Sequence, residues 1–145
     1  MPSNKDNYSA QDYQQSASMH MGKRDPLTAL AVCIEGLEHY PEDASLLCLA
    51  AKSAIAQRYL DEARLYIKKA LTLHVANASV HELHGDMQML ESQPGEAVNS
   101  YRQAQRLQTG ENGLQKKIDH ARHKMNRMRP VEGTRGTRVA FPEEM

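Results

Sequence analysis

Residues 44–77 read ASLLCLAAKSAIAQRYLDEARLYIKKALTLHVAN and contain two apolar-patterned stretches separated by a short polar break. The apolar positions are Leu46, Leu47, Ala50, Ala51 and Ala54 in 44–57, and Ala63, Ile67, Ala70, Leu71 and Leu73 in 61–73. Apolar residues at steps of three and four are typical of helices that bury one face. The segment therefore predicts two helices joined by a short turn.

Small residues recur at a period of 34 along most of the chain. The columns are Ala17, Ala51 and Gly85; Ala29, Ala63 and Ala97; and Gly36, Ala70 and Ala104. Two helices that cross at close range need small side chains, because larger ones overpack at a cost of about 1–3 kcal/mol. Pro26 and Pro94, two periods apart, suit the first turn of a second helix, and Asp43 suits an N-cap.

This pattern resembles the tetratricopeptide repeat (TPR) family, with units near 10–43, 44–77 and 78–111. The matching residues are Ala17, Ala29, Gly36 and Pro41; Leu47, Ala51, Tyr59, Ala63, Ala70 and Leu71; and Gly85, Ala97, Tyr101 and Ala104. The resemblance implies an all-α, right-handed α-solenoid of about three helix pairs plus a C-terminal capping helix. The first unit departs from the family pattern, because Tyr13 and Ser16 stand where large apolar residues are usual.

The expected domain organisation is a TPR domain over 8–129, a flexible N-terminus over 1–7 and a flexible tail over 130–145. Residues 112–129 predict a further helix, whose apolar residues are Leu114, Ile118, Ala121, Met125 and Met128. This stripe either caps the last unit or pairs two copies of the chain as a short coiled coil.

Composition narrows the classes of function. Eighteen Lys and Arg balance eighteen Asp and Glu, so a wholly basic nucleic-acid binder is not expected. The two cysteines, together with no apolar leader and no long apolar run, favour a cytoplasmic protein with reduced thiols. Charge is uneven, however: residues 116–138 hold eight Lys or Arg and two acids, which leaves a nucleic-acid accessory role as an alternative.

We expect neither an enzyme nor a cofactor or metal. The sequence has no glycine-rich phosphate loop. The histidine pairs His81/His84 and His120/His123 have the spacing of metal ligands, but the repeat places them at different heights. Cys33 falls in an apolar packing position, where burial would make it inert, whereas Cys48 has the potential for exposure on a first helix.

The resemblance implies that the first helices of successive units line a concave peptide-binding groove. Slot by slot, the candidate groove residues are Gln14, Cys48, Glu82 and Lys116; Ser18, Lys52, Asp86 and His120; and Met21, Ile55 and Met89, followed by His123. The apolar ladder suits an apolar or helical ligand, or it packs in the core. The two-carboxylate clamp of chaperone-binding relatives is absent, because its slots hold Gln14, Ser18, Leu49, Ser79 and Leu83.

The expected function is protein–protein interaction, as an adaptor, assembly factor or secretion-type chaperone that holds a peptide or helix of another protein. Two alternatives are a structural subunit that oligomerises through the last helix and a basic nucleic-acid accessory protein. Val139 and Phe141 form an apolar segment in an otherwise polar tail. They are hypothesised to dock in the groove, to contact the partner, or to remain inert.

Overall fold

The computed structural model describes residues 7–108, 110 and 113–128. These residues form seven helices and no strand. The helices are α1 (Ala10–Gly22), α2 (Pro26–His39), α3 (Ala44–Ala56), α4 (Leu60–Leu73), α5 (Ala78–Leu90), α6 (Pro94–Leu107) and α7 (Leu114–Met128). The segments expected to be flexible, 1–7 and 130–145, lie outside the described residues except for Asn7.

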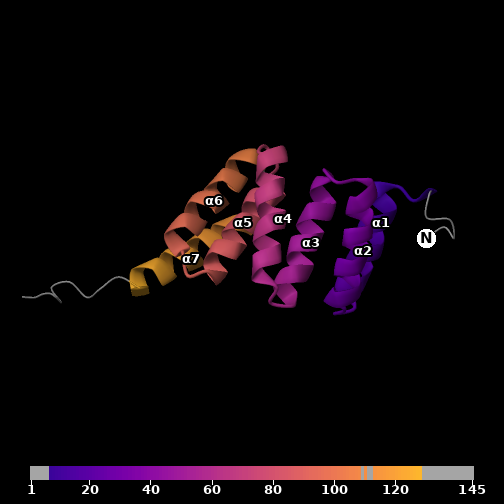
Figure 1. The fold of residues 1–145 in the computed structure, drawn as a ribbon. Coiled ribbons are helices and arrows are strands. Elements are labelled where there is room, and N and C mark those ends of the chain that lie inside the picture. The colour runs from indigo at the N-terminus through magenta and orange to yellow at the C-terminus, as the bar shows by residue number, and fades with distance from the viewer. Residues whose placement is uncertain (1–6, 109, 111–112, 129–145) are drawn as a thin grey trace, which may run out of the picture.

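The helices pack as three consecutive pairs: α1 with α2, α3 with α4, and α5 with α6. Neighbouring pairs also touch, and α7 packs on α6, so that the pairs follow one another along an elongated stack (Figure 1). The protein is therefore an all-α solenoid of three helix pairs followed by one further helix, as the repeat predicted.

Capping residues repeat with the same period as the helices. Ser9, Asp43 and Asn77, spaced by 34, each accept a hydrogen bond from a backbone N–H in the first turn of the following helix. The predicted cap at Asp43 is thereby confirmed, and so are Pro26 and Pro94 in the first turns of α2 and α6. The sequence thus sets the start of each first helix locally.

The turns inside the helix pairs share an unusual backbone conformation. Arg24, Arg58 and Ser92, again spaced by 34, have φ values of 60°, 65° and 62°. Non-glycine residues adopt this left-handed region at a cost of about 1–2 kcal/mol. The recurrence shows that the two helices of each pair are joined by the same tight turn.

The small residues lie where helices approach most closely. All seven alanines of the three columns are buried. A Cβ added at Gly36 would stand 2.9 Å from the Tyr13 Cβ, and one added at Gly85 would stand 2.6 Å from the Tyr101 ring. The columns therefore mark the contacts that set the spacing within each helix pair.

Tyr13 takes the place of the large apolar residue that the first unit lacks. Its ring is buried, and its hydroxyl donates a hydrogen bond of 3.2 Å to Glu35. Burial, and secondly that bond to the Glu35 carboxylate, raise the pKa of Tyr13 to about 12. The departure from the family pattern is thus a substitution inside the core.

We expect Gly85→Ala to destabilise the protein by about 1–3 kcal/mol, because the new methyl group would overlap the buried Tyr101 ring. Gly22→Ala is the matched control: no atom lies within 4 Å of its added Cβ, so the better helix propensity of Ala should raise stability by up to about 1 kcal/mol. Urea unfolding followed by circular dichroism measures both. Equal midpoints for the two variants would contradict the assigned contact.

Helix α7 buries its apolar stripe against the last pair. Leu114, Ile118 and Ala121 pack with Ala97 and Tyr101 of α6 in one core cluster. Because this stripe is covered, α7 caps the stack. Met128, at the end of the stripe, is exposed, but one apolar side chain is not enough to form a two-heptad coiled coil.

Candidate peptide-binding groove

The first helices α1, α3 and α5 lie side by side, and their shared face holds two pockets, which together we call the groove. The N-terminal pocket has a volume of about 280 Å³ and lies between α1, α3 and the start of α5. The C-terminal pocket, of about 480 Å³, lies between α3, α5 and α7. The capping helix therefore supplies one wall of the groove.

The C-terminal pocket is lined by apolar side chains and by cations. Its apolar residues are Ile55, Leu83, Met89 and Leu90, and its titratable ones are Lys52, Asp86, Tyr101, Lys117, His120 and Lys124. Ile55 and Met89 are only partly buried, and each also packs against a core cluster. The two residues thus contribute both to the core and to the surface of the pocket.

Most of the ladder residues named from the sequence line these pockets. Gln14, Ser18 and Cys48 line the N-terminal pocket, Ile55, Asp86, Met89 and His120 line the C-terminal one, and Lys52 lines both. Met21, Glu82 and Lys116 line neither. The Met21 sulfur instead lies 3.3 Å from the hydroxyl of buried Ser53.

Lys117, and not the neighbouring Lys116 that the period predicted, lines the C-terminal pocket. Lys116 is exposed, whereas Lys117 Nζ lies 2.7 Å from Glu82 Oε2 and 2.9 Å from Asp86 Oδ1. Helix α7 begins at Leu114, two residues later than the period places it, and of the ladder positions that fall in it His120 lines the pocket whereas Lys116 does not. The sequence carried no signal for this shift.

Lys117 is the centre of a polar cluster that joins α7 to α5 and α6. The Tyr101 hydroxyl donates a hydrogen bond of 2.7 Å to Asp86 Oδ1, and Lys117 Nζ stands 5.7 Å from the centre of the Tyr101 ring. Burial alone would lower the pKa of Lys117, but its bonds to Glu82 and Asp86 outweigh that effect and raise it. The cluster therefore stays charged and holds α7 in place.

The same cluster affects the net charge that the C-terminal pocket presents to a ligand. Both acids near the C-terminal pocket, Glu82 and Asp86, are paired with Lys117. Lys52 and Lys124 form no ion pair with any other described residue. Because the single Lys117 ammonium is shared by two carboxylates, that cluster carries one negative charge, and Lys52 and Lys124 bring the net charge of the five groups to +1, which favours an anionic group on a ligand.

Both cysteines are buried in the described structure. Cys33 is fully buried, as predicted, and burial raises the pKa of its thiol to about 12. The expectation that Cys48 can be exposed was wrong, because only 7% of its surface is accessible. That accessible part faces the N-terminal pocket. Burial raises the pKa of Cys48 as well, with nearby Lys52 opposing the effect.

We expect both thiols to react slowly with Ellman's reagent in the folded protein at pH 8, because a raised pKa leaves almost no thiolate. Reaction of Cys33 should require unfolding, and urea should accelerate labelling of both residues many-fold. Absorbance at 412 nm against time gives the rates, and mass spectrometry of trapped intermediates assigns them. Rapid labelling of Cys33 without denaturant would contradict its burial.

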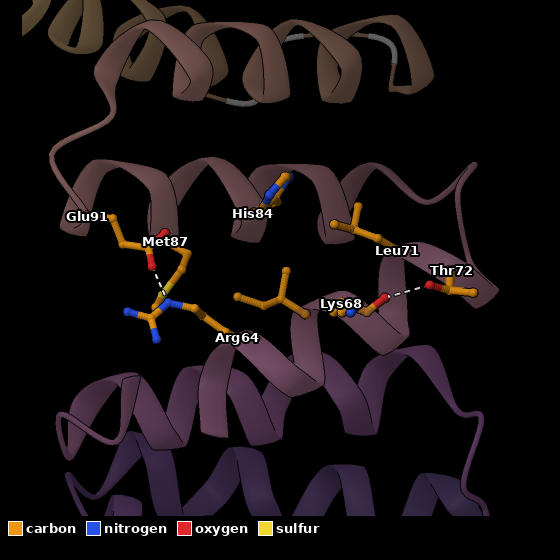
Figure 2. A pocket seen from close by; sticks show the side chains of 8 residues that line it. Arg64, Lys68, Leu71, Thr72, His84, Met87 and Glu91 are labelled. Carbon is orange, nitrogen blue, oxygen red and sulfur yellow. Dashed lines mark hydrogen bonds and ion pairs between the residues drawn. The ribbon is translucent and has the colours of Figure 1, made fainter. Parts of the chain in front are cut away.

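One histidine of each predicted pair lines a pocket, and the two pockets are different. His120 lines the C-terminal pocket of the groove, whereas His84 lines a separate pocket of about 410 Å³ between α4 and α5 (Figure 2). His84 Nδ1 lies 3.3 Å from Ser100 Oγ, and burial, together with nearby His81, lowers the pKa of His84. No group of three or more potential metal ligands occurs among the described residues.

The α4–α5 pocket was not expected from the sequence. Arg64 of α4 pairs with Glu91 at the end of α5 and closes one side of it, while Met87 and Leu71 supply apolar walls (Figure 2). The pocket forms because α4 and α6 do not pack closely on each other, leaving α5 accessible between them. Such a gap depends on helix crossing geometry, which periodicity does not encode.

No helix in the described part of the chain has the length and apolar character needed to cross a membrane. No protein-family model matches the sequence, and no curated protein sequence matches it. Comparison of the three-dimensional structure, in contrast, finds many similar solved chains.

The similar structures are TPR domains. The first TPR domain of human RPAP3 has a TM-score of 0.76 at 12% identity, over 81% of this chain and 93% of that one. The TPR domain of Sgt2 from Aspergillus fumigatus has a TM-score of 0.74 at 13% identity, over 88% and 82%. The TPR2B domain of yeast Sti1, solved as a complex with pHsp70, has a TM-score of 0.71 at 19% identity, over 83% of this chain and 98% of that one. The chain therefore has the fold of a tetratricopeptide repeat domain.

Proposed function

We propose that this protein is an interaction module that holds a peptide or helical segment of another protein in its concave groove. The observation that carries the proposal is the C-terminal pocket, where partly exposed Ile55 and Met89 line the same space as Lys52 and Lys124, two lysines that form no ion pair with another described residue. Similar structures support it: one is a first TPR of Spaghetti (RPAP3) bound to the HSP90 peptide SRMEEVD, and another is the yeast Sti1 complex with pHsp70.

The ligand class follows from the chemistry of the groove. Burial of a bulky apolar side chain against the apolar residues of the pocket favours binding by about 25 cal/mol per Å² of buried apolar area. A ligand carboxylate placed beside Lys52 or Lys124 would form a charge-assisted hydrogen bond that further stabilises the complex. The groove therefore suits a segment that combines a large apolar residue with one or more acids.

Recognition is expected to differ from that of chaperone C-terminal peptides. The five slots of the two-carboxylate clamp lie in the two pockets and are occupied by Gln14, Ser18, Leu49, Ser79 and Leu83. None of these side chains is cationic, so a terminal acidic peptide such as SRMEEVD lacks its partners here. Binding through Lys52 and Lys124 would depend on a different spacing of acids.

Among finer roles, we favour an adaptor, assembly factor or secretion-type chaperone in the cytoplasm over a subunit that oligomerises through α7. The apolar stripe of α7 is already covered by α6. A module of this kind acts by binding and needs no catalytic group, metal or cofactor of its own. The basic residues of α7 leave an accessory role with nucleic acid as the weaker proposal.

A selection from a random peptide library tests the function without knowledge of the native partner. Peptides enriched on the wild-type protein should combine a bulky apolar residue with Asp or Glu, and their affinity should fall as salt rises. The matched control is a selected peptide whose Asp and Glu are replaced by Asn and Gln, which should bind at least about 10-fold more weakly by fluorescence anisotropy. Failure to enrich any peptide above background, or equal binding of the peptide without acids, would contradict the proposal.

A further inference from the structure

The residues that line the C-terminal pocket define which ligand fits it. Its apolar side chains include Leu90, which is 43% exposed among the described residues. It is also lined by Lys52 and Lys124, which form no ion pair with another described residue, whereas Glu82 and Asp86 share Lys117. A fitting segment presents a large apolar side chain with carboxylates a few residues away.

The chain itself contains such a segment. Residues 139–144 read VAFPEE, so that Phe141, the only phenylalanine of the protein, is followed closely by Glu143 and Glu144. Arg135 and Arg138 precede the apolar residues, which confines the acidic charge to one end of the segment. Its composition thus matches the pocket in both apolar character and charge.

The connection is long enough to reach the pocket. Lys124 lines the pocket and lies one helical turn, about 6 Å, before α7 ends at Met128. The thirteen residues from there to Phe141 span up to about 45 Å when extended. The intervening sequence contains Pro130, Gly133 and Gly136, residue types that favour reversal of the chain direction.

We propose that residues 139–144 bind in the C-terminal pocket of the same chain. Phe141 lies against Ile55 and Met89, and Glu143 and Glu144 face Lys52 and Lys124. The inference rests on the proposed function of the groove, because the segment acts there as an intramolecular ligand. A short tether gives an effective concentration in the millimolar range, so an external partner must displace the segment and binds more weakly than to an empty pocket.

Photocrosslinking in the full chain tests this arrangement. With Phe141→p-benzoylphenylalanine, irradiation at micromolar concentration should give crosslinks to Ile55, Met89 or Leu90 within species of monomer mass. Glu143→Lys with Glu144→Lys should reduce that yield at least about 5-fold by repulsion. Adding Lys52→Glu with Lys124→Glu should restore it, since the charges are then exchanged. The rescue excludes a loss of yield through misfolding.

Several results would overturn the proposal. It is contradicted if the crosslinks map to α2 or α4, if they occur only at dimer mass, or if no protein crosslink forms. It is also contradicted if the crosslinking yield does not change with the charge reversals. Crosslinks at dimer mass would identify a second copy as the occupant.

A binding measurement separates this proposal from the proposed function of the groove. A peptide from the library selection should bind Phe141→Asp about 2–10-fold more tightly than wild type, because the competing segment is removed. Equal affinities would overturn the tail proposal and leave the groove function intact. Failure of both proteins to bind any selected peptide would count against the groove function, while intrachain crosslinks would still support the tail proposal.

Discussion

Ala63→Arg is expected to unfold the middle of the solenoid, with a loss of more than about 3 kcal/mol. Ala63 has no accessible surface and belongs to the core cluster formed by α3, α4 and α5. A guanidinium placed there adds volume that the core cannot accommodate and a charge without a partner, and both effects destabilise. For a protein of marginal stability, that loss is a large part of the total free energy of unfolding.

Thermal and urea unfolding, followed by circular dichroism, measure this effect. Ala31→Arg is the matched control, because Ala31 lies in the middle of α2 with its side chain exposed, and the same substitution should change stability by less than about 0.5 kcal/mol. If Ala63→Arg melts within a degree or two of wild type, the 34-residue register that places Ala63 in the core is wrong.

The second large effect is on binding. Ile55→Asp combined with Met89→Asp should weaken a library-selected peptide at least about 100-fold while the helical content stays unchanged. Each apolar anchor contributes about 1.5–3 kcal/mol when a ligand covers it, and each new carboxylate also repels an acidic ligand. Both positions are only partly buried, so the carboxylates can remain hydrated in the free protein.

Ile34→Asp combined with Leu65→Asp is the control for that experiment. These side chains are 47% and 68% exposed and lie on the second helices α2 and α4, away from the two groove pockets. Their replacement should leave peptide affinity within about 2-fold of wild type. A loss of helicity in the groove variant would assign Ile55 and Met89 to the core, and an equal loss of affinity in the control would place the binding site elsewhere.

The helix pairs were predictable because their determinants are local. The stretches 44–57 and 61–73 correspond within one residue to α3 and α4 at every end. Apolar steps of three and four define a buried face, while Asp43 and the first-turn prolines fix helix starts from the residues themselves. The small-residue columns added the contact between helices, because only close approach explains Ala and Gly at one fixed period.

The candidate site was predictable only as far as the period extends. Ile55 and Met89 were found because successive first helices place equivalent slots on one face. Lys117 was missed because the period places the neighbouring Lys116 in the groove, although Lys116 lines neither pocket and Lys117 lines the C-terminal one. Its pairing with Glu82 and Asp86 joins residues more than 30 positions apart, and such pairings depend on side-chain geometry that periodicity does not specify. The burial of Cys48 likewise follows from how α3 is covered by its neighbours.

The binding surface proposed for this protein is the groove formed by α1, α3, α5 and α7. Methyl and amide chemical-shift mapping by NMR, during titration with a library-selected peptide, tests it most directly. We expect the largest shifts at Ile55, Met89 and Leu90 and at the amides around Lys124, with little change at Ile34 and Leu65. Shifts concentrated on α2 and α4, with the groove unaffected at saturation, would contradict it.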